Sequence, residues 1–253
     1  MTLLERIHGS YVHRRRIAAL SGHIAEIIPD RATVLDVGAG DGLLAAEVAR
    51  RSPGIEIQGI DVLVRDRTNI PVDLFDGKAI PRGRDAVDVV LLIDVLHHAD
   101  QPARLLDEAV RVARRAIVVK DHLLEGLGAD WILRFMDRVS NRRHGVSLPH
   151  NYWSRDEWRR AFAALPGTVE VWKQDLHIYP LPASLVFDRS LHFLARLDLD
   201  AAATPWKPSG GVAEVGQPAE PDSVEGRRAT AQSEAPSGRS KRSITRRTGT
   251  TLS

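Results

Sequence analysis

Apolar and polar positions alternate along the first part of the chain between short apolar runs and longer stretches with helical spacing. Within residues 17–28 the apolar side chains recur every three or four positions, which predicts an amphipathic helix. Residues 33–37 form a short apolar run that leads into glycines, and helical spacing resumes over residues 43–51. This pattern indicates strand–helix units that follow one another along the chain.

The same alternation continues to about residue 119. Apolar runs predict strands over residues 55–60, 86–93 and 116–119, and a helix over residues 102–113 separates the last two. Strands that are apolar on both faces belong in a parallel sheet covered by helices. With right-handed crossovers we therefore expect an α/β fold with a doubly wound sheet, in which ligands bind outside the carboxyl ends of the strands.

The pattern is less regular after residue 123. An amphipathic run over residues 131–136 precedes a polar loop over residues 140–153. The segment from Ser154 to Glu157 has the form of a capping box, which predicts a helix that begins there and reaches about residue 164. Two closing strands are predicted over residues 169–176 and 190–197.

Composition changes after about residue 204. Residues 205–253 are rich in Pro, Gly, Ser, Thr, Glu and Arg and contain one aromatic residue, Trp206. Such a segment cannot bury enough apolar surface to offset the entropy of ordering. We therefore expect a folded domain over residues 1–200 and a disordered basic tail over residues 205–253. The tail is either a solvated segment or a contact for an anionic polymer or a membrane surface.

Charge and cysteine content narrow the class of protein. The 253 residues carry a formal net charge of +2 and include no cysteine, which excludes disulfides, thiolate metal ligands and a cysteine nucleophile. No metal-ligand set is predicted. No apolar run approaches the length of a membrane span, and no secretory signal follows the N-terminus. We expect a cytoplasmic protein with no membrane span and no clear nucleic-acid partner, and the sequence does not indicate the oligomeric state.

The glycine-rich segment after the first predicted strand carries most of the chemistry. It reads Val-Leu-Asp-Val-Gly-Ala-Gly-Asp-Gly over residues 34–42. Glycines accept unusual backbone angles and let a ligand approach the main chain, and the following helix N-terminus offers unpaired N–H groups. Gly38, Gly40 and Gly42 have the spacing Gly-x-Gly-x-Gly, unlike the Gly-x-Gly-x-x-Gly of dinucleotide folds. Asp36 lies inside the strand, two residues before the first glycine.

This segment resembles the first motif of the class I S-adenosylmethionine-dependent methyltransferases, which typically reads Val-Leu-Asp-x-Gly-x-Gly-x-Gly. The resemblance covers about residues 30–122 and implies a Rossmann-like, mostly parallel seven-stranded sheet with an antiparallel last strand. It also implies S-adenosyl-L-methionine as the cofactor. In that family the main chain of the glycine loop holds the methionine part of the cofactor, and the acid at the Asp36 position organises the site around the amino group.

Acidic residues after the next strands extend the predicted cofactor site. Asp61 ends the second strand, where a carboxylate can accept hydrogen bonds from both ribose hydroxyls; the alternative is a helix N-cap. Val62 is placed to pack on the adenine. The family often has an acid a few residues before a Leu-Pro pair, where it contacts the adenine amino group; this chain has Ile80-Pro81, and Asp76 matches that spacing better than Asp73. Phe75 either stacks on the ring or belongs to the core.

The fourth predicted strand ends in a second motif. Residues 87–98 read Val-Asp-Val-Val-Leu-Leu-Ile-Asp-Val-Leu-His-His and resemble the small-molecule branch of the family, which often ends this motif in Leu-His-His. The resemblance places Ile93 and Asp94 beside the transferring methyl. His97 and His98 begin the next helix, where one faces the cofactor or each is a buried structural histidine. The expected acceptor is a small molecule that is methylated on oxygen or nitrogen.

Methyl transfer from a sulfonium is an in-line displacement, so the protein mainly aligns an acceptor lone pair with the carbon–sulfur bond. A hydroxyl or protonated amine also needs a base, and histidine titrates in the right range. His122, next to Asp121 after the fifth predicted strand, is the first candidate, and His150 in the following loop is the second. Because many methyltransferases work without a dedicated base, the chain either uses one of these residues or none.

The segment that follows the fifth predicted strand lies at the ligand edge of the sheet. We expect residues 123–160 to form a substrate cap. Its apolar and aromatic side chains line the acceptor site or pack as ordinary core. They are Trp131, Phe135, Met136, Tyr152 and Trp153.

Three other functions compete with this interpretation. A nucleotide-dependent oxidoreductase predicts glycine where Leu43 stands and gives no reason for Asp36. A methyltransferase that acts on nucleic acid or protein is suggested by the basic tail, but the body lacks an obvious phosphate-binding face. A non-catalytic protein that keeps the fold is the third alternative.

Overall fold

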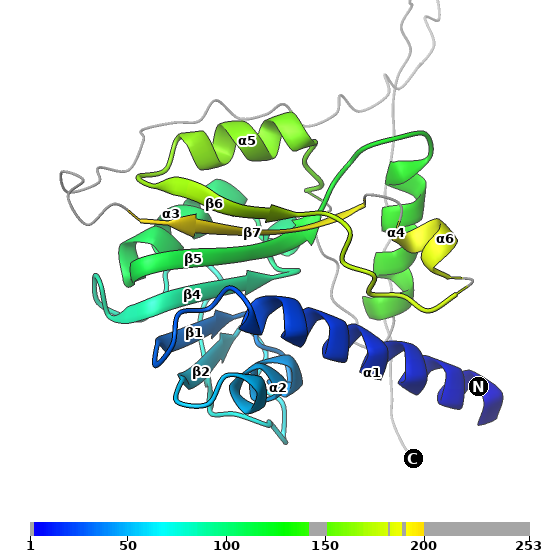
Figure 1. Ribbon diagram of the computed structural model, residues 1–253, viewed down its shortest axis with the longest axis horizontal. Helices are drawn as coiled ribbons and strands as arrows, with labels where there is room; N and C mark the ends of the chain where they lie inside the picture. The colour runs from blue at the N-terminus through cyan, green and yellow to red at the C-terminus, as the bar shows by residue number, and fades with distance from the viewer. Residues whose placement is uncertain (1–2, 142–150, 182, 189–190, 200–253) are drawn as a thin grey trace, which may run out of the picture. The chain divides into compact units, whose positions relative to one another are not determined.

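The computed structural model describes residues 3–141, 151–181, 183–188 and 191–199. A seven-stranded sheet lies at its centre (Figure 1). The strands, in the order in which they lie across the sheet, are β3 (Val72–Leu74), β2 (Glu56–Asp61), β1 (Thr33–Val37), β4 (Val87–Ile93), β5 (Ala113–His122), β7 (His192–Asp198) and β6 (Thr168–Lys173). Strand β7 runs antiparallel to both of its neighbours, and the other neighbouring pairs are parallel. The predicted fold class is confirmed.

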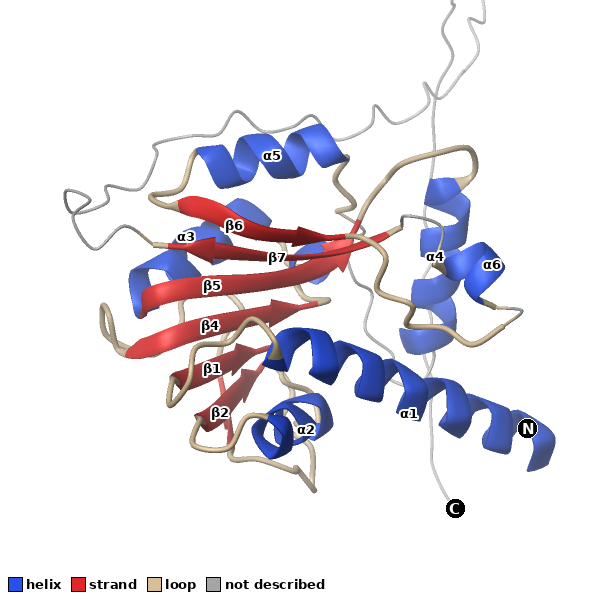
Figure 2. Ribbon diagram, in the orientation of Figure 1, coloured by secondary structure: helices blue, strands red, loops and turns tan. Residues whose placement is uncertain are grey.

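Helices cover both faces of the sheet (Figure 2). On one face, α1 (Leu3–Ala25) and α2 (Leu43–Arg51) pack apolar side chains such as Leu20 and Val48 against β1, β4 and β5. On the other face, α3 (Pro102–Val112) and α5 (Arg155–Ala163) contribute Leu106 and Trp158 to a second apolar cluster. The central strands β1, β4 and β5 are covered on both faces, so most of their residues are buried and apolar.

Three short or peripheral helices complete the description. They are η1 (Leu96–His98), α4 (Ala129–Asn141) and α6 (Ser184–Phe187). Figure 1 shows α4 and α6 beyond the carboxyl ends of β4 and β5. Leu133 and Met136 of α4 form a small apolar cluster with Tyr152 and Leu191. Among the described residues, no helix combines the length and apolarity that crossing a bilayer requires.

Several element boundaries differ from the sequence prediction. Helix α1 begins at Leu3, well before the predicted residue 17, and β5 extends from Ala113 to His122 where only residues 116–119 were predicted. The sequence pattern missed β3, because it has three residues of which two are exposed. The capping box at Ser154 is confirmed, since its Oγ accepts a hydrogen bond from Glu157 N and the Glu157 carboxylate accepts one from Ser154 N. The predicted tail, residues 205–253, lies outside the described residues.

Candidate functional site

The glycine loop between β1 and α2 turns through three left-handed residues. Gly38, Gly40 and Gly42 have φ angles of 76°, 61° and 69°, a region that residues with a Cβ rarely adopt. The N–H groups of Gly38 and Ala39 both donate to the Ile60 carbonyl oxygen, at 2.8 and 3.2 Å. The loop is therefore attached to the carboxyl end of β2, and this attachment brings β1 and β2 into one site.

The three glycines are required for different reasons. A Cβ at Gly38 would lie 2.4 Å from Val95 Cγ2, and one at Gly42 would lie 2.5 Å from Ile70 Cγ1. At Gly40 the nearest atom would be Arg65 Nη2, the end of a flexible side chain, at 3.4 Å. Gly38 and Gly42 are thus demanded by packing, whereas Gly40 faces space that a ligand can enter.

Two alanine substitutions separate these roles. Gly38→Ala is expected to lower the free energy of unfolding by about 2–4 kcal/mol, because it combines a left-handed Cβ with overpacking against Val95. Gly40→Ala carries only the backbone cost, about 1–2 kcal/mol. Urea unfolding monitored by circular dichroism measures both. The double variant Gly38→Ala/Val95→Ala should recover part of the loss, and equal losses for the two single variants would contradict this assignment.

Asp61 connects the loop to the end of β2. Its Oδ2 accepts a hydrogen bond from Gly40 N at 2.7 Å, and its Oδ1 accepts one from Leu63 N at 2.9 Å. No helix begins at this point, so the helix N-cap alternative is wrong. An ionised carboxylate accepts about four hydrogen bonds, so each oxygen of Asp61 keeps room for another donor. The side chain is therefore able to hold a pair of hydroxyls while it orders the loop.

Asp36 is buried beneath the same loop. It pairs in register with Gly59 of β2 and is 4% exposed. Burial, together with the nearby charge of Asp61, raises the pKa of Asp36 to about 7. A carboxyl group at this position is therefore close to its ionisation midpoint at neutral pH, and a cationic ligand group beside it would favour the charged form.

The raised pKa of Asp36 makes stability depend on pH. In an unfolded chain an aspartate has a pKa near 3.9, so between about pH 4 and pH 7 the folded protein holds a proton that the unfolded chain has lost. Proton binding to Asp36 therefore favours the folded state fully below about pH 4, and this contribution is lost as the pH rises to about 7. The free energy of unfolding of the wild type minus that of Asp36→Asn should fall by about 2 kcal/mol from about pH 5 to about pH 8. The exposed Asp100→Asn is the control, and a difference independent of pH would contradict the expectation.

The residues predicted around the adenine differ in their accessibility to a ligand. Val62 is 59% exposed, and a Cβ at Gly77 would lie 3.1 Å from its Cγ1. Asp76 is exposed and its Oδ1 accepts hydrogen bonds from Ala79 N and Lys78 N, which lower its pKa. Asp73 instead forms an ion pair with Arg82, and Phe75 belongs to the apolar core. Val62 and Asp76 are thus available to a ligand, whereas Phe75 is not.

A buried ionic group lies at the carboxyl ends of β4 and β5. Asp94, directly after β4, has a left-handed φ of 55° and accepts hydrogen bonds from Lys120 Nζ and from the Arg16 guanidinium of α1. Burial would raise the pKa of Asp94, but the charges of Lys120 and Arg16 hold it well below its usual value. Lys120 is 1% exposed, and its Nζ also lies 3.2 Å from His192 Nδ1. The register explains this meeting, because Ile93 pairs with Lys120 across the parallel strands.

Asp121 organises a second group beside the first. Its Oδ1 lies 2.5 Å from His97 Nδ1 and 3.4 Å from His122 Nδ1, and its Oδ2 accepts a hydrogen bond from Leu96 N. Asp121 is buried, yet its pKa is lowered by His97 and His122. His97 is 1% exposed, which matches the structural-histidine alternative. A direct pair between Asp121 and His122 is present but is longer than the pair with His97.

His122 is the more open of the two histidines. Its side chain is 7% exposed against 1% for His97. Its Nδ1 faces two carboxylates, Asp121 at 3.4 Å and Asp94 at 3.7 Å. Burial, with the nearby His97 and Lys120, lowers the pKa of His122, so the ring is neutral at neutral pH. The second predicted base, His150, lies outside the described residues.

Four side chains of these groups could in principle reach one cation. Asp94, His97, Asp121 and His122 each offer an atom within 4.8 Å of the others. However, the Asp94 carboxylate already contacts the charged groups of Lys120 and Arg16. A divalent ion would have to bind beside these two positive charges, so we interpret the cluster as a hydrogen-bonding network.

The predicted apolar lining of the cap divides into two sets. Tyr152 and Met136 are buried, and Trp153 is partly buried against the main core, as the core alternative expects. Trp131 and Phe135 are 70% and 45% exposed and stack on each other with ring centroids 5.8 Å apart.

Sequence reasoning missed the roles of Arg16, Lys120 and His192. A lysine and an aspartate at the end of an apolar strand were the available signal, since buried charges are seldom present without partners.

Comparison with known proteins agrees with this geometry. A family model described as a methyltransferase domain matches residues 8–165. A protein named as an uncharacterized methyltransferase from Mycobacterium sp. (strain JLS) is 36% identical over 105 residues, which are 39% of this chain and 41% of that protein. A ubiquinone biosynthesis O-methyltransferase from Psychrobacter cryohalolentis is 30% identical over 151 residues, which are 50% of this chain and 58% of that protein. The chain thus spans about half the length of these relatives.

Solved structures show the same fold at low sequence identity. A protein from Pyrococcus horikoshii has a TM-score of 0.55 at 16% identity, with 74% of this chain and 91% of that chain covered. A SAM-dependent methyltransferase from Thermotoga maritima has a TM-score of 0.52 at 16% identity, with coverage of 78% and 96%. The family model covers more than half of the sequence and includes the glycine loop, Asp61 and the Asp94 and Asp121 groups. This chain therefore belongs to the methyltransferase-domain family.

Proposed function

We propose that this protein transfers a methyl group from S-adenosylmethionine to an oxygen or nitrogen atom of a small-molecule acceptor. The observation that carries the proposal is the hydrogen bond between Gly40 N and Asp61 Oδ2, at 2.7 Å, on a loop where the end of the flexible Arg65 side chain is the nearest group to the Gly40 Cβ position. This arrangement supplies bare main chain for the methionine part and a carboxylate for the ribose. Membership in the methyltransferase family favours it over a nucleotide-dependent oxidoreductase.

The residues of the chain fit the cofactor at each end of the site. At Gly40 the left-handed main chain carries no side chain, Asp61 keeps free acceptor capacity, and Asp36 can offset an ammonium group. Val62 and Asp76 would contact the adenine. Ile93 and Asp94 would border the methyl group, with the Asp94 side chain held in place by Lys120 and Arg16. When bound, the cofactor supplies a methyl group that its positive sulfur already activates.

His122 is the proposed base for the acceptor. Two carboxylates lie on the Nδ1 side of the ring, so the proton of the neutral ring belongs on Nδ1, and Nε2 would take the proton from a hydroxyl or amine. The lowered pKa keeps the ring neutral and receptive at neutral pH. Asp121 and Asp94 would stabilise the imidazolium that forms. The remaining contribution of the protein is alignment of the acceptor with the methyl group.

Calorimetry with the full chain tests the proposed cofactor. S-adenosylmethionine and its demethylated product should bind, whereas NAD should not. A screen of phenols and small amines for formation of the demethylated product then identifies the acceptor class. Absence of heat with both sulfur compounds, on protein that shows a cooperative unfolding transition, would refute the proposal.

The base is tested by exchanging the two histidines separately. His122→Gln should lower kcat by about 100-fold while the affinity for S-adenosylmethionine stays the same, because a general base acts on the acceptor alone. The acid limb of the pH–rate profile should disappear in this variant. His97→Gln, which removes the 2.5 Å contact with Asp121, should mainly lower stability. An unchanged pH profile for His122→Gln would assign the proton to another group or to solvent.

A further inference from the structure

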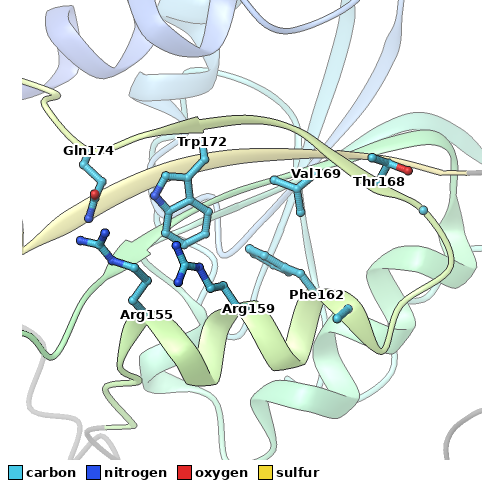
Figure 3. Close-up of a pocket in the computed structure, with 9 residues that line it drawn as sticks. Arg155, Arg159, Phe162, Thr168, Val169, Trp172 and Gln174 are labelled. Atoms are coloured by element: carbon cyan, nitrogen blue, oxygen red, sulfur yellow. The ribbon is translucent and has the colours of Figure 1, made fainter.

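A cavity lies at the β6 edge of the sheet, away from the glycine loop. It has a volume of about 540 Å³ and lies between α5 and the edge strand β6 (Figure 3). Strands β4, β5 and β7 separate β6 from β1, which carries the glycine loop. The residues that line it are Arg155, Arg159, Phe162, Ala163, Gly167, Thr168, Val169, Trp172 and Gln174. The cavity is therefore separate from the proposed cofactor site, and its lining includes two arginines and no carboxylate.

Two buried donors in the wall of this cavity have no acceptor. Arg155 Nε and Gln174 Nε2 are both buried without a hydrogen-bond partner among the described residues. Figure 3 shows the amide end of Gln174 and the guanidinium of Arg155 directed toward one another, so two donors face each other. Arg155 binds Glu125 through Nη2 at 3.0 Å, which fixes the guanidinium in this position. Because buried polar groups are nearly always paired, an acceptor from outside the chain would satisfy both donors at once.

The other wall of the cavity is aromatic and rigid. Trp172 stacks on Phe193 with ring centroids 4.5 Å apart and an interplanar angle of 8°. Phe162 meets Trp172 edge-on at 6.2 Å. The half-buried Trp172 ring thus presents a fixed apolar surface beside the charged residues. Arg159 also lines the cavity (Figure 3), and its side chain is 66% exposed, with a weak ion pair to Asp156 at 3.4 Å.

We propose that this cavity binds a small aromatic anion, with a flat ring that carries a carboxylate or phosphate group. The acidic oxygens accept hydrogen bonds from Arg155 Nε and Gln174 Nε2, Arg159 adds charge, and the ring packs on Trp172. Guanidinium groups favour planar oxyanions and aromatic faces together. The site is distinct from the site of methyl transfer and does not depend on the proposed function.

Titration of the full chain with 1-naphthyl phosphate tests the proposal by calorimetry. We expect saturable binding of one equivalent, and at least about tenfold weaker binding of 1-naphthol and of inorganic phosphate, each of which lacks half of the recognised chemistry. Excess S-adenosylmethionine should not displace the probe. Displacement would place the probe in the cofactor site and overturn the assignment, as would equal affinities for the three compounds or absence of binding.

Variants of the cavity provide the second measurement. Gln174→Glu puts a carboxylate next to Arg155 and should weaken the probe at least tenfold, and Arg159→Met should weaken it severalfold. Arg160→Met is the matched control, because Arg160 is exposed on the same helix and does not line the cavity. Circular dichroism and urea unfolding confirm that each variant is folded. The site would be refuted if Gln174→Glu and Arg159→Met bound the probe as tightly as Arg160→Met does.

Discussion

Replacement of Asp61 by alanine is expected to weaken binding of S-adenosylmethionine by about 10²–10⁴-fold. Hydrogen bonds to a charged group contribute about 1.5–3 kcal/mol each. Two ribose hydroxyls therefore account for roughly 3–6 kcal/mol, which corresponds to this range of affinity. The loop loses support at the same time, because Gly40 N and Leu63 N both donate to Asp61. Isothermal calorimetry on the full chain measures the affinity.

Two variants make the Asp61 result specific. Asp73→Ala removes an aspartate that is 64% exposed and paired with Arg82, so its affinity should stay within about twofold of the wild type. Asp61→Asn keeps one acceptor oxygen and should fall between the wild type and Asp61→Ala. Urea unfolding distinguishes lost binding from lost structure. A folded Asp61→Ala protein that binds the cofactor within threefold of the wild-type affinity would exclude the ribose role.

Asp94→Asn is expected to lower the free energy of unfolding by about 3–5 kcal/mol in the absence of ligand. The change leaves the buried Lys120 ammonium without its carboxylate partner, and removal of one member of a buried ion pair has this magnitude. Asparagine is the suitable replacement because it tolerates the left-handed backbone at this position. Burial already lowers the pKa of Lys120, so the variant should become more stable as the pH rises toward the range in which the amine is neutral.

Two further variants show whether the lost free energy of unfolding comes from the buried ion pair. Asp130→Asn breaks an ion pair with Arg134, in which both side chains are at least half exposed, and should cost about 0–1 kcal/mol. The double variant Asp94→Asn/Lys120→Met removes both charges and should recover most of the stability. Similar urea midpoints for Asp94→Asn and Asp130→Asn would show that the pair between Asp94 and Lys120 contributes little.

The site residues that the sequence predicted are close to one another in the sequence or lie at the ends of neighbouring strands. Gly38, Gly40 and Asp36 belong to one strand–turn–helix segment, so local pattern suffices to place them together. Asp61 ends the next strand, and parallel pairing of consecutive strands brings its carboxylate to Gly40. The apolar run of β1 predicted this strand because it is buried on both faces, and β2 was predicted from its apolar positions at Ile55, Ile57 and Ile60.

The other residues of the site depended on contacts between distant segments. Arg16 and Asp94 are 78 positions apart, and Lys120 and His192 are 72 positions apart. Helix α1 begins well before the predicted residue 17. The prediction missed this part because the first turns lack a clear apolar stripe, and Arg16, which binds Asp94, lies in it. The pairing of His97 with Asp121 requires the turn of η1 after β4, which residue spacing does not reveal.

The sequence alone determined the doubly wound sheet, the glycine turn and the acid at the end of the second strand, because the order of apolar runs and the position of glycines are local properties of the sequence. Only the tertiary structure decided which charges neutralise Asp94, which histidine contacts Asp121 most closely and where the cavity between α5 and β6 lies. These depend on strand register and on the antiparallel insertion of β7 between β5 and β6, which brings side chains from opposite ends of the chain within hydrogen-bonding distance.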